Sequence, residues 1–277
     1  MYNSLIFEGG GMKAMCYAGA LESLEALGVV ELDKLQYYGG TSAGAIMATL
    51  LASGHTVSEI CDIIYKTKWS KFKDGNILTN TIRLFSKFGF HKGNEIETFI
   101  DDLLFAKFGV RNITFEQMFL KTQKHLRMVG TNLTRGSILY MDHYQTPSMP
   151  ICVGVRISSC IPFVFKPVKY KDDLYVDGAL IKNLDLDMFE EFETKTLALE
   201  ISDKENLPIK NLATFGLKVF SIIYEEANRV IQNNESIVSI RETKINPIDF
   251  KLKKDDLDYL REVGSSAVKD KFGMRNT

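Results

Sequence analysis

Histidine, cysteine and long apolar runs are scarce in this 277-residue sequence, and neither sign of charge predominates. The net charge of −1 argues against a general nucleic-acid-binding protein, which would carry a basic excess. No apolar run reaches the roughly 20 residues that cross a bilayer. The first residues lack the basic flank and the cleavage pattern of a signal peptide. We therefore expect a cytoplasmic protein that binds no nucleic acid.

The four cysteines lie far apart in apolar surroundings and form no CxxC pair: Cys16, Cys61, Cys152 and Cys160. Zinc sites and redox motifs show short, patterned cysteine spacings, which are absent from this sequence. We interpret the cysteines as buried free thiols in a reducing compartment. The apolar share of 45% and the charged share of 25% are ordinary for a soluble globular protein.

The N-terminal quarter alternates between strand and helix patterns. Residues 4–7 and 35–38 form short apolar runs typical of buried strands, and helical patterns follow at 12–27 and 43–52. This order predicts an α/β fold in which a parallel sheet carries helices on its faces. Further elements are predicted at 94–105, 126–133, 138–141, 151–158, 164–168, 174–176, 196–201, 209–231 and 255–269. Because no repeat or linker interrupts them, we expect residues 1–277 to form a single domain.

The motif Gly40-Thr41-Ser42-Ala43-Gly44 stands between a predicted strand and a predicted helix. This is the GxSxG pattern of a nucleophile elbow, in which a serine sits on a turn so tight that only small residues fit on either side. The helix that follows offers unpaired N–H groups to negative charge. A glycine-rich turn with an inert serine would show the same five residues.

Three glycines, Gly9, Gly10 and Gly11, separate the first predicted strand from its helix. Without side chains, their backbone N–H groups can approach a ligand closely. The loop could therefore hold an oxyanion or cradle a phosphate. Its spacing matches neither GxGxxG nor GxxxxGK[ST], which argues against a nucleotide site.

A serine nucleophile needs a base, and the candidates are few. Hydrolases with a Ser, Asp, His chain order need a late histidine, and the last of the four histidines is His143. The histidines, which are more typical of surface or core positions, are His55, His91, His125 and His143. A carboxylate is the remaining type of base. Asp177 ends an apolar run and precedes Gly178, but the residues alone do not separate it from an ordinary Asp-Gly turn.

Taken together, these segments resemble the patatin-like phospholipase family. The glycine loop with Lys13 is similar to the family's oxyanion loop, and residues 40–44 match its nucleophile motif. Residues 177–179, Asp-Gly-Ala, match its catalytic Asp-Gly-Gly/Ala, and residues 158–167 match its Ser-x-x-Ile-Pro-x-x-Phe-x-Pro block. The four blocks occur in the family's order over residues 6–183. Residues 203–277, a predicted helical part, lie outside the resemblance.

The resemblance implies a three-layer α/β/α patatin-like fold with a mainly parallel sheet and a Ser–Asp dyad, without metal or other cofactor. Ser42 would attack an acyl carbonyl while Asp177 accepts its proton. The implied oxyanion donors are the N–H groups of Gly9, Gly10 and Gly11. The implied supporting residues are Lys13, Gly40, Gly44 and Gly178.

The implied activity is that of a serine esterase of the phospholipase A type, acting on phospholipids, lysophospholipids or other acyl lipids. An acyltransferase is one alternative, but malonyl-type transferases place a histidine before the nucleophile, where this chain has Thr41. A catalytically silent scaffold protein is another alternative. The presence of both Ser42 and Asp177 argues against it.

Two positions depart from the family pattern. Ala14 stands where a glycine often follows the basic residue of the glycine loop. Asp185 replaces a proline that usually follows the family's asparagine, here Asn183. We expect Asp185 to loosen the loop that carries Asp177.

Residues 66–92 combine basic and aromatic side chains. Seven Lys or Arg residues face a single acid, Asp74, and Trp69 is among the interleaved aromatics. Such a composition fits a surface that meets anionic lipid, with Trp69 as the interfacial anchor, so we expect transient peripheral membrane contact. A solvated insertion whose aromatics pack on the domain is the alternative.

Overall fold

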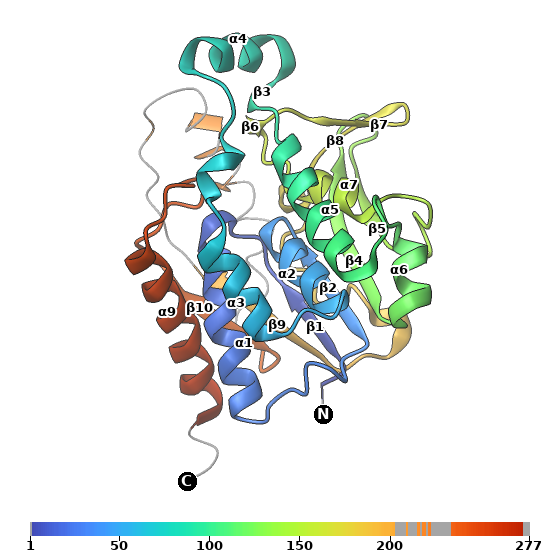
Figure 1. Cartoon of the computed structure of the whole chain (residues 1–277), viewed down its shortest axis with the longest axis vertical. Helices are drawn as coiled ribbons and strands as arrows, with labels where there is room; N and C mark the ends of the chain where they lie inside the picture. The colour runs from blue at the N-terminus through green and yellow to red at the C-terminus, as the bar shows by residue number, and fades with distance from the viewer. Residues whose placement is uncertain are drawn as a thin grey trace.

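The computed structural model describes residues 2–202, 209, 215–216, 218–219, 221–222 and 234–273. The helix predicted at 209–231 therefore falls largely outside the described residues. Figure 1 shows a twisted central sheet with helices packed beside it, and with α4 projecting beyond the rest.

The central sheet has the strand order β10-β9-β1-β2-β4-β8-β7, and β5 pairs with β4 off this path. Strands β10, β9, β1, β2 and β4 are parallel, whereas β5 and β8 run antiparallel to β4, and β7 antiparallel to β8. The bounds are β1 Ser4–Phe7, β2 Tyr37–Thr41, β4 His125–Asn132, β5 Ser137–Met141, β7 Val168–Tyr170, β8 Asp173–Asp177, β9 Thr196–Ser202 and β10 Ile237–Arg241. Two short strands, β3 Gly89–His91 and β6 Phe163–Phe165, form a separate parallel pair.

The larger hydrophobic core lies between the helices and one face of the sheet. Buried side chains of α1, α2, α5, α7 and α9 form one cluster with strand residues such as Leu5 and Phe7. The helix bounds are α1 Tyr17–Ala26, α2 Ala43–Ala52, α3 Val57–Lys66, α4 Ile77–Lys87, α5 Asn94–Phe108, α6 Phe115–Thr122, α7 Ile151–Ser158 and α9 Lys254–Phe272. Short 3₁₀ helices are η1 Gly11–Cys16, η2 Trp69–Phe72, η3 Gly178–Leu180 and η4 Glu190–Phe192.

The other face of the sheet is covered by a second, smaller cluster. Ile6 and Val129 point to this side from the strands, and Leu184, Met188 and Phe189 pack on them from the segment after β8. The predicted three-layer α/β/α fold with a mainly parallel central sheet is confirmed. None of the described helices combines the length and apolar character that crossing a bilayer requires.

Several element bounds differ from the prediction for local reasons. The helix predicted at 12–27 begins as the 3₁₀ helix η1, in which Lys13 N–H donates to Gly10 O, three residues back, at 3.2 Å. The strand predicted at 164–168 divides into β6 and β7 around Pro167, which has no N–H to donate to a ladder. Strand β10 was not predicted, and it extends the sheet beyond β9.

Trp69 does not lie at the surface, so its predicted role as an interfacial anchor is wrong. Its side chain is only 6% exposed, and its ring centroid lies 5.7 Å from that of Phe72 and 6.0 Å from that of Phe99. Its indole N–H donates to Ile64 O at 3.0 Å. The aromatic side chains of η2 pack in the core. This is what the alternative prediction, in which the aromatics pack on the domain, expects.

Candidate active site

The turn between β2 and α2 has the geometry of a nucleophile elbow. Ser42, the residue before the first helical turn, has φ 54° and ψ −125°, a backbone conformation that is strained for a residue with a side chain. A Cβ on Gly40 would lie 2.5 Å from the Gly44 carbonyl carbon, and one on Gly44 would meet the carbonyl of Phe7. The glycines at both ends of the motif are therefore required by the packing of this turn.

Helix α7 supports the backbone of the elbow through hydrogen bonds. Ser42 N–H donates to Ser158 Oγ at 2.9 Å, and Ser158 Oγ donates in turn to Val129 O of β4 at 2.6 Å. The neighbouring Thr41 hydroxyl donates to Lys182 O at 3.3 Å. These bonds fix the backbone of the serine relative to the sheet and to the segment after β8.

The structure brings Asp177 to Ser42. Asp177 ends β8 and is 1% exposed, and its carboxyl lies close enough to the Ser42 side chain for the serine to influence its pKa. Its Oδ1 accepts the Ala179 N–H at 2.9 Å. Burial raises the pKa of Asp177 to about 7, against the opposing effect of the Ala179 N–H and the Ser42 side chain. Gly178 lets this loop pack against β4, since a Cβ there would lie 2.5 Å from Val129 O.

All four histidines have partners away from the dyad. The ring of His55 bonds to Ser53, and that of His91 to Asp74. His125 and His143 pack on each other and on Phe119. No described contact joins an imidazole to Ser42 or Asp177, so a Ser-His-Asp arrangement does not form.

The glycine loop lies beside the serine, but its three N–H groups differ. A Cβ on Gly9 would be 2.8 Å from Ser42 Cβ, so the loop passes directly along the nucleophile. Gly9 N–H donates to Asn183 Oδ1 at 3.0 Å and is not available to an oxyanion. Within the described residues, no acceptor is bonded to the N–H of Gly10 or Gly11. Of the three predicted donors, Gly9 is therefore the one whose N–H already has a partner within the protein.

Asn183 is a site residue to which the sequence reasoning gave no role. Its Nδ2 donates to Gly9 O at 2.9 Å and to Glu8 Oε1 at 3.0 Å. Glu8 is fully enclosed, and burial, reinforced by the charge of Glu200, raises the pKa of its carboxyl. Its other oxygen accepts the Ile201 N–H at 2.6 Å. The available signal was that Asn183 matches the asparagine of the family pattern, shortly after Asp177.

Lys13 finds its counter-ion in the part of the chain beyond the family resemblance. Lys13 Nζ lies 3.6 Å from Glu242 Oε2, and both side chains are almost completely buried. Glu242 Oε1 accepts the N–H groups of Lys244 and Ile245 at 2.6 and 3.0 Å. No motif marked Glu242, because the pairing depends on the path of the chain after β10.

Asp185 does not loosen the loop that carries Asp177, so that expectation is wrong. Its side chain is buried, and its Oδ2 accepts the Tyr140 hydroxyl at 2.6 Å. Its Oδ1 pairs with Lys182 Nζ at 2.6 Å. Two charge-assisted contacts anchor the segment at the point where the family usually has proline. Ala14, the other departure, is fully buried in η1.

The described residues contain no group of three or more His, Cys, Asp or Glu side chains that could hold a metal ion. The residues gathered around Ser42 are instead a carboxylate, backbone N–H groups and neutral hydrogen-bonding side chains. This set can perform proton transfer and stabilise an oxyanion.

Comparison with known proteins agrees with this geometry. The family model for "Patatin-like phospholipase" matches residues 5–190 of the chain. The chain belongs to the patatin-like phospholipase family. The match spans both ends of the candidate site, from the glycine loop to the segment after Asp177.

Two relatives are similar to this protein over most of its length. The uncharacterized protein YqhO of Bacillus subtilis (strain 168) is 32% identical over 81% of this chain and 80% of its own length. The "probable lipid hydrolase 463L" of Invertebrate iridescent virus 6 is 30% identical over 100% of this chain and 92% of its own length.

Two solved structures of other proteins have the same fold as this chain. VipD from Legionella pneumophila superposes with a TM-score of 0.74 over 99% of this chain and 67% of VipD, at 15% identity. ExoU of Pseudomonas aeruginosa, in complex with SpcU, superposes with a TM-score of 0.58 over 99% of this chain, at 20% identity. The chain spans about half of ExoU, 52% of that chain.

Proposed function

We propose that the protein is a lipid acyl hydrolase that cleaves fatty-acyl esters of phospholipids or lysophospholipids through a serine acyl-enzyme. The observation that carries this proposal is the pairing of the strained Ser42 with the buried carboxylate of Asp177, with no histidine between them. The substrate class follows from membership of the patatin-like phospholipase family. A related chain, the human "calcium-independent phospholipase A2-gamma", is 22% identical over 65% of this chain.

In the first step, Ser42 Oγ attacks the acyl carbonyl carbon and transfers its proton to Asp177. The carbonyl oxygen becomes an oxyanion, which the N–H groups of Gly10 and Gly11 stabilise. The tetrahedral intermediate then collapses, the ester bond to the alcohol breaks, and Asp177 returns the proton to the leaving alkoxide. The acyl group remains on Ser42 Oγ.

In the second step, water takes the place of the alcohol. Asp177 accepts a proton from the water as its oxygen attacks the acyl carbon, and the same two N–H groups stabilise the second oxyanion. Collapse of this intermediate releases the fatty acid, and Asp177 gives the proton back to Ser42 Oγ. A base with a pKa of about 7 suits this exchange, since it both accepts and returns a proton near neutral pH.

The alternatives predict different residues at this site. In the acyltransferase alternative a histidine would precede the nucleophile, whereas the Thr41 side chain is buried and bonded to Lys182 O. A silent scaffold protein has no requirement for a strained serine beside a buried acid, and such strain costs about 1–3 kcal/mol. The hydrolase is the function that the geometry supports best.

The test compares wild type with Ser42→Ala and Asp177→Asn on a phospholipid, a lysophospholipid and a soluble ester. Each variant is expected to lose about a thousandfold or more of kcat/KM, as dyad members act as a unit. Ser53→Ala is the matched control, because Ser53 is also a buried serine but bonds to His55, away from the site. A fluorophosphonate should label wild type and Ser53→Ala at Ser42. Full activity in either dyad variant would refute the assignment.

A further inference from the structure

Helix α4 and its final cap residue turn three large apolar side chains toward solvent. Ile82, Phe85 and Phe88, the residue that ends the helix, are 60%, 70% and 64% exposed and are spaced three residues apart. We call these three residues the α4 stripe. The inner side of the helix carries Asn80 and Leu84, both buried. A surface helix of a globular protein normally buries its apolar stripe, so this orientation is reversed.

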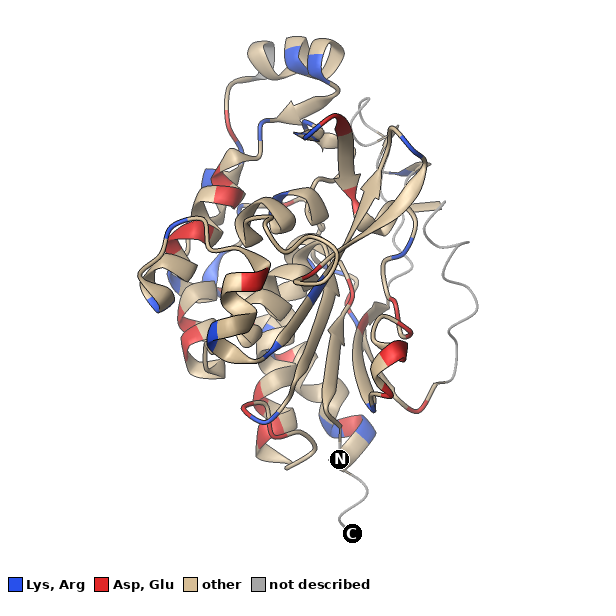
Figure 2. Cartoon of the chain, turned by 90° about the vertical axis from the view of Figure 1, so that its right-hand side faces the viewer, with Lys and Arg blue, Asp and Glu red and all other residues tan. Residues whose placement is uncertain are grey.

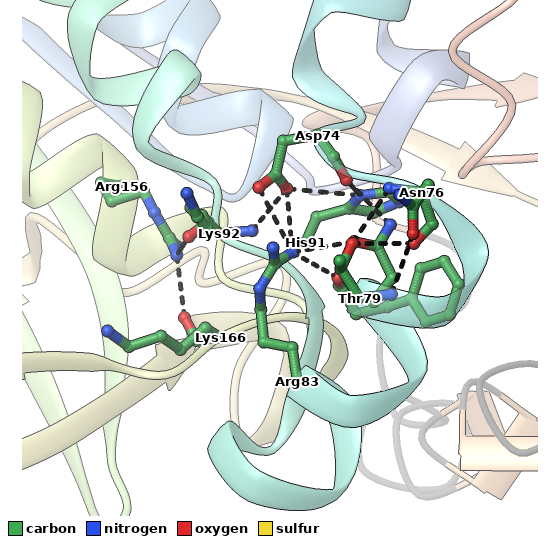
Figure 3. Close-up of polar contacts among 10 residues, drawn as sticks. Asp74, Asn76, Thr79, Arg83, His91, Lys92, Arg156 and Lys166 are labelled. Carbon is green, nitrogen blue, oxygen red and sulfur yellow. Dashed lines mark hydrogen bonds and ion pairs between the residues drawn. The ribbon is translucent and has the colours of Figure 1, made fainter.

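A polar cluster at the base of the helix fixes this orientation (Figure 3). Asp74, before the helix, accepts the Lys92 N–H at 2.7 Å from beyond its end. Arg83 pairs with Asp74 at 3.2 Å and donates to Phe90 O at 2.8 Å. His91 Nδ1 bonds to Asp74 O at 3.0 Å. Because the segments entering and leaving α4 are tied together, the stripe is held outward by the fold.

The helix is also tied to the candidate active site. Arg156 of α7 donates to Lys92 O and Lys166 O at 2.5 and 2.8 Å, which joins the base of α4 to the segment after β6. The same helix α7 carries Ser158, which accepts the Ser42 N–H. Strand β3, directly after α4, pairs with β6, whose first residue, Phe163, is 40% exposed. The α4 stripe and the nucleophile therefore share one supporting helix.

The surroundings of the stripe are positively charged. No Asp or Glu occurs between Gly75 and Asn94, whereas Arg83, Lys87 and Lys92 lie in that stretch. Figure 2 shows the projecting helix with blue bands and no red. An outward apolar face with basic neighbours is the combination that binds at the boundary of headgroups and acyl chains in anionic membranes.

We propose that α4 is the element by which the protein docks on an anionic phospholipid surface, with the α4 stripe entering the acyl–headgroup boundary and Lys87 meeting the headgroups. This docking would bring phospholipid to the proposed hydrolase. It rests on the proposed function only in assuming that the bound lipid is then cleaved at Ser42. This assignment replaces the buried Trp69 with Phe85 as the central aromatic anchor.

The test measures co-sedimentation with vesicles of equal parts phosphatidylcholine and phosphatidylglycerol, using a Ser42→Ala background so that no turnover alters the vesicles. Ile82→Ser and Phe85→Ser are each expected to weaken vesicle affinity about tenfold or more, because each removes a large apolar side chain from the interface. The matched control is Leu120→Ser, since Leu120 of α6 is 66% exposed on another helix. Its vesicle affinity should equal that of the background protein.

The charge component is tested with Lys87→Glu against Lys121→Glu, a lysine in the last turn of α6. Lys87→Glu should weaken binding about fivefold or more to the anionic vesicles, in proportion to their charge, and the control should not. Equal binding by Phe85→Ser and the background protein would overturn the proposal. Self-association that is lost in Phe85→Ser, with unchanged vesicle binding, would overturn it too by assigning the stripe to a second copy of the chain. Neither result depends on hydrolysis, which the wild-type assay tests separately.

Discussion

The carboxamide of Asn183 binds both backbone polar groups of Gly9. Oδ1 accepts the Gly9 N–H at 3.0 Å, and Nδ2 donates to Gly9 O at 2.9 Å. Gly9 lies against the nucleophile, since a Cβ on Gly9 would be 2.8 Å from Ser42 Cβ. Asn183 therefore fixes the glycine loop to the segment that follows Asp177, and the two halves of the proposed site are held in one geometry.

Asn183→Ala is expected to lower kcat about 10- to 100-fold with little change in KM, because the loop that carries the Gly10 and Gly11 donors would lose its register. Steady-state kinetics on a soluble ester measure this effect. Asn132→Ala is the control, since Asn132 is also buried and bonds to Asp173 at the start of β8. An equal loss of kcat in both variants would trace the effect to general destabilisation and contradict the positioning role.

The pKa of Asp177 predicts how activity depends on pH. As a base, Asp177 must be ionised, and its pKa is raised to about 7 by burial. We expect kcat/KM of the wild type to fall about tenfold per pH unit below the apparent pKa and to level off above it. Hydrolysis of a soluble ester between about pH 5 and about pH 9 measures this profile. A flat profile over that range would exclude a base with this pKa.

The same pKa predicts a cost in stability. Between the ordinary value of 3.8 and about 7, native Asp177 keeps a proton that the unfolded chain has lost, so stability falls as pH rises through this window. Asp177→Asn, which stays neutral, should exceed wild type in free energy of unfolding by on the order of a few kcal/mol at about pH 8. Urea unfolding should show that the gain shrinks toward about pH 4. A gain that does not depend on pH would have another cause.

The backbone of Ser42 predicts a difference between two inactive variants. At φ 54° and ψ −125°, a residue with a Cβ is strained, whereas glycine is not. We expect Ser42→Gly to be more stable than Ser42→Ala by about 1 kcal/mol, after the greater freedom of glycine in the unfolded chain is set against the relieved strain. Urea unfolding of the two proteins provides the comparison. If Ser42→Ala proves equally or more stable, the elbow stores no strain.

The buried pair of Lys13 and Glu242 predicts a large effect of a single change. Glu242→Gln removes the negative charge from this buried ion pair, which should cost about 3–5 kcal/mol in free energy of unfolding. Glu59→Gln removes the partner of Lys107 at the surface and should cost no more than about 1 kcal/mol. The double variant Lys13→Met/Glu242→Leu should recover most of the loss. Equal losses of free energy of unfolding in Glu242→Gln and Glu59→Gln would show that burial does not make the Lys13–Glu242 pair more costly to break than a surface pair.

Local patterns predicted the first strands and the elbow, because each depends on a few neighbouring residues. The run at 4–7, the small residues around Ser42 and the Asp-Gly step at Asp177 are all visible within a short window. The choice of Asp177 over other acids came from the family resemblance. Its burial beside the Ser42 side chain is what the structure adds.

Local composition could not tell which aromatic side chains of residues 66–92 are buried and which are exposed. Trp69 and Phe85 both stand among basic residues, yet Trp69 is buried against Phe72 and Phe99, and Phe85 is exposed. The difference arises from the Asp74 cluster, which fixes the direction in which α4 faces. Asp185 gives a second case, since its partner Tyr140 is 45 residues away and turns an expected weak point into an anchor.

The sequence by itself determined the fold class and the family, and it led to the two residues proposed as the dyad, because each family motif occupies no more than about ten consecutive residues. Only the tertiary structure decided that the Gly9 N–H is already bonded within the protein, and which aromatic side chains of residues 66–92 are exposed. Asn183 occupies the Gly9 N–H across 174 residues, and Glu242 reaches Lys13 across 229. Such contacts depend on where the sheet and its loops bring distant segments together, and no local pattern records them.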